Sequence, residues 1–227
     1  MGLLNKEFKV KAAKAKKDSP GAVSDTLFVP TGFDILDHYS GTVINTDNGE
    51  EAFNLGLPMG KIIMYVGHSQ SGKTTKAIQD AWHMVKDLNG DVVICDFERS
   101  SNDLESRVMN ITGCTNEEFD DTFTLFKQKD LTAEFLKKFL FEIAEQKASM
   151  GKSCFVDWYD IKFNETKIYP PTVVIIDSVA SMRSKELLEN PDMDTNMTAA
   201  SIAKSNSAFL TSIEHLLEEY NITLLAI

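Results

Sequence analysis

Two glycines, a lysine and two threonines lie close together in the stretch VGHSQSGKTT, directly after an apolar run. From Gly67 to Thr74 the stretch matches the pattern G-x-x-x-x-G-K-[ST] of a loop that wraps a polyphosphate. It lies between a predicted strand and a predicted helix, which is the context that such a loop requires. A chance match in a chain of this length arises in about one protein in a hundred. The stretch therefore predicts a nucleotide site rather than an ordinary glycine-rich turn.

Each residue type in this loop has a physical role. Gly67 and Gly72 let the backbone curl until successive N–H groups point at phosphate oxygens, and the helix that starts near Lys73 adds the positive end of its dipole. The Lys73 side chain supplies a positive charge for the β- and γ-phosphates, and the Thr74 hydroxyl is a ligand for Mg²⁺. The other residues of the cradle are expected to act mainly through their backbone: His68, Ser69, Gln70, Ser71 and Thr75.

A carboxylate is expected beside this loop to hold the water shell of the metal ion. The best candidate is Asp177, which closes the apolar run TVVIID. The carboxyl end of a parallel strand lies where open α/β sheets bind their ligands, so Asp177 would lie next to the loop. Asp also favours helix N-caps, and a structural cap is the alternative interpretation.

A second acidic group follows another apolar run, in VVICDFERS. Glu98 lies just beyond this predicted strand, where a carboxylate can orient and deprotonate the water that attacks a γ-phosphate. Asp96, two residues earlier, projects to the same face of the strand and competes for the role. The residue pattern does not decide between them, and a solvated acid at a strand end is a further alternative.

The apolar runs that carry these residues predict an α/β fold. Four runs without polar alternation indicate buried strands, and helical patterns lie between them. Strands of this kind separated by helices are typical of a mostly parallel sheet with helices on both faces. The predicted strands are residues 62–66, 91–98, 172–178 and 222–227, and the predicted helices are residues 72–90, 132–151 and 196–221.

Composition bounds the class of protein. The chain has 227 residues and 43% hydrophobic content, enough for one large domain with a buried core. Its three cysteines, Cys95, Cys114 and Cys154, are scattered, which argues against a disulfide framework or a zinc site. No apolar run approaches the length of a membrane span, and the N-terminus has no hydrophobic signal region. These features predict a soluble protein of the cytoplasm.

The formal net charge of −11 is distributed unevenly. Six lysines fall within KEFKVKAAKAKKD near the N-terminus. A basic segment, residues 1–25, therefore precedes an acidic core at residues 26–227. The basic segment is either a solvated, partly helical tail or an arm that contacts DNA or another subunit, and charge alone does not decide between the two.

The order of these segments resembles the core of RecA-type recombinases, including phage RecA-like members of the UvsX kind. The resemblance covers nearly all of the chain from about Phe28, in VPTGFDILD, GLPMGKIIMYVGHSQSGKTT, VVICDFE, VVIIDSVAS and ITLLAI. It implies a RecA-like P-loop NTPase core that uses ATP and Mg²⁺ in recombination and repair. Such a protein assembles head to tail into filaments on single-stranded DNA and pairs that strand with homologous double-stranded DNA. In that family the glutamate that ends the second core strand activates the attacking water, so the resemblance assigns this role to Glu98.

The resemblance also places a DNA-binding loop in SKELLENPDMDTNMTAAS, residues 184–201. Phosphate binding depends on Lys and Arg, yet basic groups nearby are few: Arg183, Lys185 and Lys204. The loop itself is acidic, so its charge supports DNA binding only weakly. A solvated acidic loop is the alternative.

Three features depart from the family pattern. Where many members carry an aromatic residue that stacks on adenine, this chain has Glu105. Residues 152–170 are longer than the family's connection and predict an inserted hairpin, in which Trp158 and Tyr159 either pack or stack on bases. The chain stops on LLAI, an apolar strand expected in the middle of the sheet. We therefore expect an incomplete core without the γ-phosphate sensor, second DNA-binding loop and trans-acting groups that follow in the family.

Two other functions stay open from the sequence. A ring helicase has the same type of motor core and would form closed rings rather than open filaments. A recombination mediator would bind ATP without turnover. The set of Lys73, Thr74, Asp177 and Glu98 argues against a mediator, whereas the truncated end argues for one.

Overall fold

The computed structural model describes residues 27–45, 49, 51–98, 103–127, 131–160, 164–183 and 195–227. The basic segment 1–25 and most of the predicted DNA-binding loop, residues 184–194, lie outside the described residues. No helix in the described ranges is long and apolar enough to cross a membrane.

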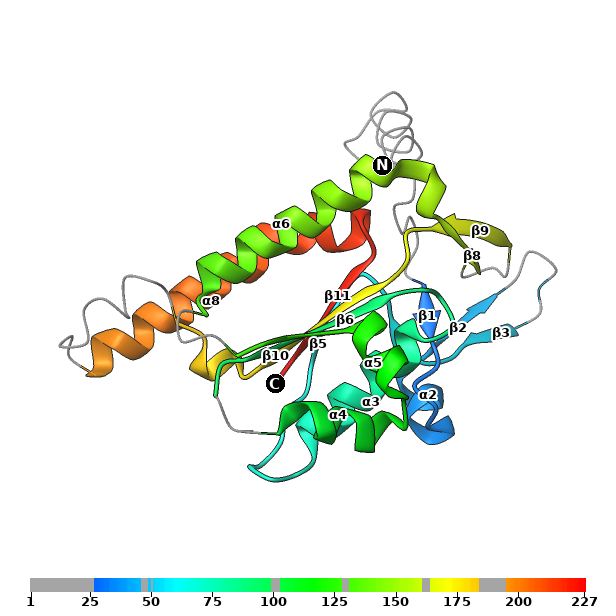
Figure 1. Ribbon diagram of the computed structural model, residues 1–227. Coiled ribbons are helices and arrows are strands. Elements are labelled where there is room, and N and C mark those ends of the chain that lie inside the picture. The colour runs from blue at the N-terminus through cyan, green and yellow to red at the C-terminus, as the bar shows by residue number, and fades with distance from the viewer. Residues whose placement is uncertain are drawn as a thin grey trace, which may run out of the picture.

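A five-stranded parallel sheet forms the centre of the molecule (Figure 1). Its strands lie in the order β5 (Ile62–Met64), β11 (Ile222–Ala226), β10 (Thr172–Asp177), β6 (Asp91–Asp96) and β7 (Phe123–Phe126). Every neighbouring pair in this order is parallel. The predicted α/β fold is therefore confirmed. The run 222–227 forms a strand inside the sheet, between β5 and β10, as its largely apolar sequence predicts.

Two strands differ from the prediction. The run 62–66 predicts a buried strand, but β5 lies at the edge of the sheet and, among the described residues, pairs only with β11. Met64 and Val66 are accordingly 58% and 85% exposed. The strand β7 is not among the predicted strands, because it is only four residues long and directly follows the helix α5 (Asn116–Thr122).

Helices cover both faces of the sheet (Figure 1). Helices α3 (Lys73–Val85), α4 (Leu104–Thr112) and α5 lie on one face, and α6 (Ala133–Met150) and α8 (Thr195–Glu219) lie side by side on the other. The predicted helices 132–151 and 196–221 are confirmed by α6 and α8. Helix α3 ends at Val85, before the predicted stop at Gly90. The short helices α4 and α5 are not among the predicted ones.

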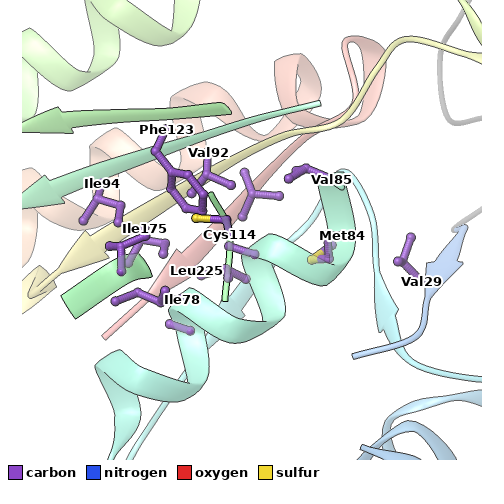
Figure 2. Packing of buried hydrophobic residues seen from close by; sticks show 14 of the residues in the cluster. Val29, Ile78, Met84, Val85, Val92, Ile94, Cys114, Phe123, Ile175 and Leu225 are labelled. Atoms are coloured by element: carbon purple, nitrogen blue, oxygen red, sulfur yellow. The ribbon is translucent and has the colours of Figure 1, made fainter. Parts of the chain in front are cut away.

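Alternate residues of the central strands face opposite layers of helices. Val173 and Ile175 of β10 belong to the apolar cluster shared with α3, whereas Val174 and Ile176 belong to the cluster shared with α6 and α8. Figure 2 shows the first cluster filling the space between the strands and α3, which contributes Ile78. Burial on both faces is the physical reason for strands without polar alternation.

Smaller elements attach to this core. Strand β1 (Phe28–Val29) pairs with β4 (Leu57–Pro58), and helix α2 (Asp34–Ser40) precedes a hairpin of β2 (Thr42–Asn45) and β3 (Glu51–Asn54). After α6 the chain forms a 3-10 turn, η1 (Gly151–Cys154), and the antiparallel pair β8 (Val156–Tyr159) and β9 (Glu165–Ile168). This pair confirms the hairpin predicted in residues 152–170. Trp158 packs against the core, whereas Tyr159 is 55% exposed.

Lys147, near the end of α6, holds this helix to the amino edge of the sheet. Its Nζ donates to the carbonyl oxygens of Pro170 at 2.7 Å, Tyr220 at 2.9 Å and Asn221 at 3.4 Å, in the connections that lead into β10 and β11. Burial of the side chain lowers the pKa of Lys147 to about 7, although the nearby Asp91 raises it. Folding therefore favours the loss of a proton from this side chain.

We expect the stability of the protein to rise with pH in a way that depends on Lys147. An unfolded lysine has a pKa of about 10.4, so between about pH 7 and pH 10 the unfolded chain binds more protons than the folded one. The free energy of unfolding then rises by up to about 1.4 kcal/mol per pH unit. Urea unfolding between about pH 7 and pH 9 measures this slope.

The Lys147→Met variant should lose most of this pH dependence. Lys137→Met, which changes an exposed lysine on the same helix, is the matched control and should keep the slope of the unmodified protein. Equal slopes in all three proteins would contradict the prediction.

Candidate functional site

The loop between β5 and α3 has a backbone suited to a phosphate cradle. Gly72 caps α3 in the left-handed conformation, with a φ of 86°, where an L side chain would be strained. A Cβ on Gly67 would come within 2.9 Å of Ser71 Oγ, so this hydroxyl would have to move. The loop residues are exposed and open to a ligand: Gly67, His68, Ser69, Gln70, Ser71 and Gly72.

Lys73 is the first residue of α3, and its ammonium is held over the loop. Its Nζ donates to the carbonyl oxygens of His68 at 2.8 Å and Gly67 at 3.1 Å. The amino end of the helix adds positive potential at the same place. The positive charge therefore lies where loops of this type bind the β- and γ-phosphates of a nucleotide.

A cavity of about 610 Å³ opens beside Lys73. Its walls include Gly67 of the loop, Met64 and Val66 next to the exposed edge of β5, and Ile202 of α8. Most of these side chains are apolar, so the cavity adjoins the phosphate cradle but is not itself suited to phosphate.

Thr74 and Asp177, the two predicted metal-binding groups, lie next to each other. Thr74 Oγ1 donates to Asp177 Oδ2 at 2.8 Å, which links the first turn of α3 to the end of β10. Burial raises the pKa of Asp177, and the nearby Glu98 and Asp96 raise it further, whereas the bond from Thr74 lowers it. Carboxylate and hydroxyl oxygens are the ligands that Mg²⁺ prefers, and a cation would relieve the repulsion among these acids. The residues therefore fit Mg²⁺.

Glu98 and Asp96 follow the same strand but differ in burial. Asp96 is the last residue of β6 and is 4% exposed, whereas Glu98 lies in the bend beyond the strand and is exposed. Ser178 Oγ donates to Glu98 Oε1 at 2.6 Å. This bond holds the Glu98 carboxylate beside the end of β10. Exposure and orientation therefore favour Glu98 over Asp96 as the group that contacts an attacking water.

Two residues of the site are absent from the sequence-based prediction. Ser178 orients Glu98, and its sequence signal is a hydroxyl directly after a strand-ending acid. Arg107, on α4, places Nη2 at 3.4 Å from Thr75 Oγ1. Periodicity does not reveal this contact, because it depends on how α4 packs. Glu105, at the position where many RecA-type proteins carry an aromatic residue, is exposed on the same helix.

A network centred on the buried Asp80 fixes the junction between β5 and α3 behind the loop. Tyr65 Oη donates to Asp80 Oδ2 at 2.5 Å, and Lys76 Nζ forms an ion pair with Asp80 Oδ1. Burial raises the pKa of Asp80, while the bonds from Lys76 and Tyr65 lower it. Tyr65 comes just before the loop and Asp80 lies in α3, so this network holds the two ends of the loop in place.

Comparison with known families agrees with this geometry. A family model described as an AAA domain matches residues 50–227, which is more than half of the chain. The chain belongs to this family of P-loop NTPases, which is related to the RecA-like ATPases. No curated protein matches the sequence.

Lys73→Ala should abolish measurable ATP binding, because it removes the positive charge held over the loop. Titration with a fluorescent ATP analogue measures the affinity. Lys86→Ala removes an exposed lysine just after α3 and is the matched control, which should bind like the unmodified protein. If the Lys73→Ala variant binds the analogue equally well, the nucleotide site lies elsewhere.

Proposed function

We propose that the protein is an ATP-hydrolysing motor of the RecA type that acts on single-stranded DNA in recombination and repair. The main support for ATPase activity is that two hydrogen-bonded pairs lie next to each other, Thr74 with Asp177 and Ser178 with Glu98. The first pair offers oxygen ligands for Mg²⁺. The second pair offers an exposed, oriented carboxylate for a water molecule.

The role of each residue follows from the chemistry of phosphoryl transfer, in which positioning and charge stabilisation dominate. Lys73 and the N–H groups of the loop bind the β- and γ-phosphates. Thr74 and Asp177 would hold Mg²⁺, which would neutralise charge on the phosphate oxygens. Glu98, held by Ser178, orients the attacking water and accepts its proton.

Support for a DNA substrate comes from the order of the core segments and from the place of residues 184–194. These residues lie outside the described ranges, but they follow η2 (Val179–Ser181), which comes directly after the strand that ends in Asp177. A DNA strand bound by this segment would therefore lie a short stretch of chain from the metal-binding acid. Arg183 and Lys204, both exposed, add positive charge on either side of the segment.

Self-association is part of the same proposal. Head-to-tail contacts generate helices when the rotation does not close, and each neighbour can then add groups to the nucleotide site of the next subunit. The exposure of the loop and of Glu98 leaves the site open to such a neighbour. The proposed partners are single-stranded DNA, double-stranded DNA during pairing, and further copies of this chain.

Glu98→Gln should keep ATP binding but lower the rate of hydrolysis by about 10²-fold or more, because the amide cannot accept a proton. Asp96→Asn should lower it much less, since Asp96 is buried at the end of β6. A phosphate-release assay at saturating ATP measures both variants. The reverse ranking would move the catalytic role to Asp96.

The Glu98→Gln variant, which should hold MgATP without turnover, should form open helical filaments on single-stranded DNA. Electron microscopy of the variant with a thymidine oligonucleotide and MgATP tests this, and Lys73→Ala is the control that should form none. Closed rings would indicate a helicase instead. Assembly on DNA by an unmodified protein that never hydrolyses ATP would indicate a mediator.

A further inference from the structure

The guanidinium of Arg107 lies beside the first turn of α3. Helix α4 packs against α3 on the same face of the sheet (Figure 1). Its buried residues Leu104 and Val108 join the apolar cluster shared with α3 and so fix the rotation of α4. This rotation brings Arg107 Nη2 to 3.4 Å from Thr75 Oγ1.

Arg107 approaches the loop from the side opposite to Lys73. Two residues correspond to a rotation of about 200° around an α-helix, so the side chains of Lys73 and Thr75 leave α3 in nearly opposite directions. Lys73 contacts the carbonyl oxygens of Gly67 and His68, whereas Thr75 meets Arg107. Two cations therefore flank the amino end of α3.

Arg107 has donors left for a ligand. A guanidinium has five N–H donors, and within the described residues the Arg107 side chain makes one hydrogen bond, which is long for an N–H···O bond. None of the ion pairs in the described part of the chain includes it.

We propose that Arg107 is a second nucleotide-binding cation, which contacts the α- and β-phosphates that ADP and ATP share. In loops of this type the lysine reaches the β- and γ-phosphates, while the backbone holds the α- and β-phosphates. Thr75 lies one residue beyond the metal-binding Thr74 and away from Lys73, which marks the α-phosphate side. A guanidinium there presents paired donors to phosphate oxygens.

This role concerns affinity rather than the chemical step. A contact to the phosphates that ADP retains is made before hydrolysis as well as during it, so its main effect is to lower KM. Its effect on kcat is small and comes from the charge that develops on the β-phosphate as the γ-phosphoryl group leaves. The inference rests on the proposed nucleotide site. It adds a binding residue on α4 to a cradle that the loop and α3 otherwise provide.

The test compares the affinities of the unmodified protein, Arg107→Ala and Arg107→Lys for MgADP and MgATP by calorimetry. Arg107→Ala should weaken both nucleotides by a similar factor, about tenfold or more. It should raise KM for ATP and change kcat by less than about threefold. Arg107→Lys should recover part of the affinity, because lysine keeps the charge but not the paired donors. Lys86→Ala is the matched control and should change neither affinity.

Two outcomes would overturn the inference. Loss of ATP affinity with unchanged ADP affinity would place Arg107 at the γ-phosphate. A lower melting temperature with unchanged affinities for both nucleotides would make Arg107 a structural link between α4 and α3.

The ADP titration separates this inference from the proposed function. If the unmodified protein binds MgADP but does not hydrolyse ATP, the ATPase proposal fails, and the loss or retention of ADP affinity in Arg107→Ala still decides the role of Arg107. If the unmodified protein binds neither nucleotide, both proposals fail.

Discussion

The parallel pairing of β6 with β10 is the constraint on which the candidate site depends. Its register places Asp177 opposite Asp96, so both strands end at the same edge of the sheet. The backbone bonding continues beyond the strands, because the N–H groups of Phe97 and Glu98 donate to Asp177 O at 2.7 Å and 3.2 Å. Glu98 is thus held beside Asp177 before any side chain contributes. A slip of one residue would exchange the side chains that face the two layers of helices, so the apolar clusters that fix the register also fix the site.

Burial of the sheet on both faces confines its charged groups to the ends of the strands. Asp96, Glu98 and Asp177 gather at one edge, and this concentration of negative charge raises the pKa of Asp177 beyond the effect of its burial. Lys73 and the amino end of α3 supply positive potential across the loop. A magnesium–nucleotide complex would match this separation, because the acids would hold its metal and Lys73 its phosphates. The charges of the site are therefore better balanced with such a ligand than by the neighbouring side chains alone.

The central strands could be predicted from the sequence because burial of both faces makes most of their residues apolar. β6, β10 and β11 are covered on both faces, so their sequences are largely apolar and show no polar alternation. The edge position of β5 could not be predicted in the same way. Ile62 and Ile63 are partly buried against the two layers of helices and give an apolar run like that of a central strand. An edge strand differs from a central one in having a single neighbouring strand, and the apolar pattern within a strand does not reveal how many neighbours pair with it.

The residues of the site also differ in how far the sequence alone predicts them. Gly72 could be predicted because its own backbone, with a φ of 86°, needs glycine, and the other loop residues keep a fixed spacing from it. The choice between Asp96 and Glu98 depends on the burial of Asp96 and on the hydrogen bond from Ser178 to Glu98, and the residue pattern reveals neither. Arg107 depends on even less local information, because an arginine can reach a loop from any element that packs nearby. Residues that shape the backbone thus leave a signature in the sequence, whereas residues that tune affinity or orientation from a neighbouring element emerge only from the packing.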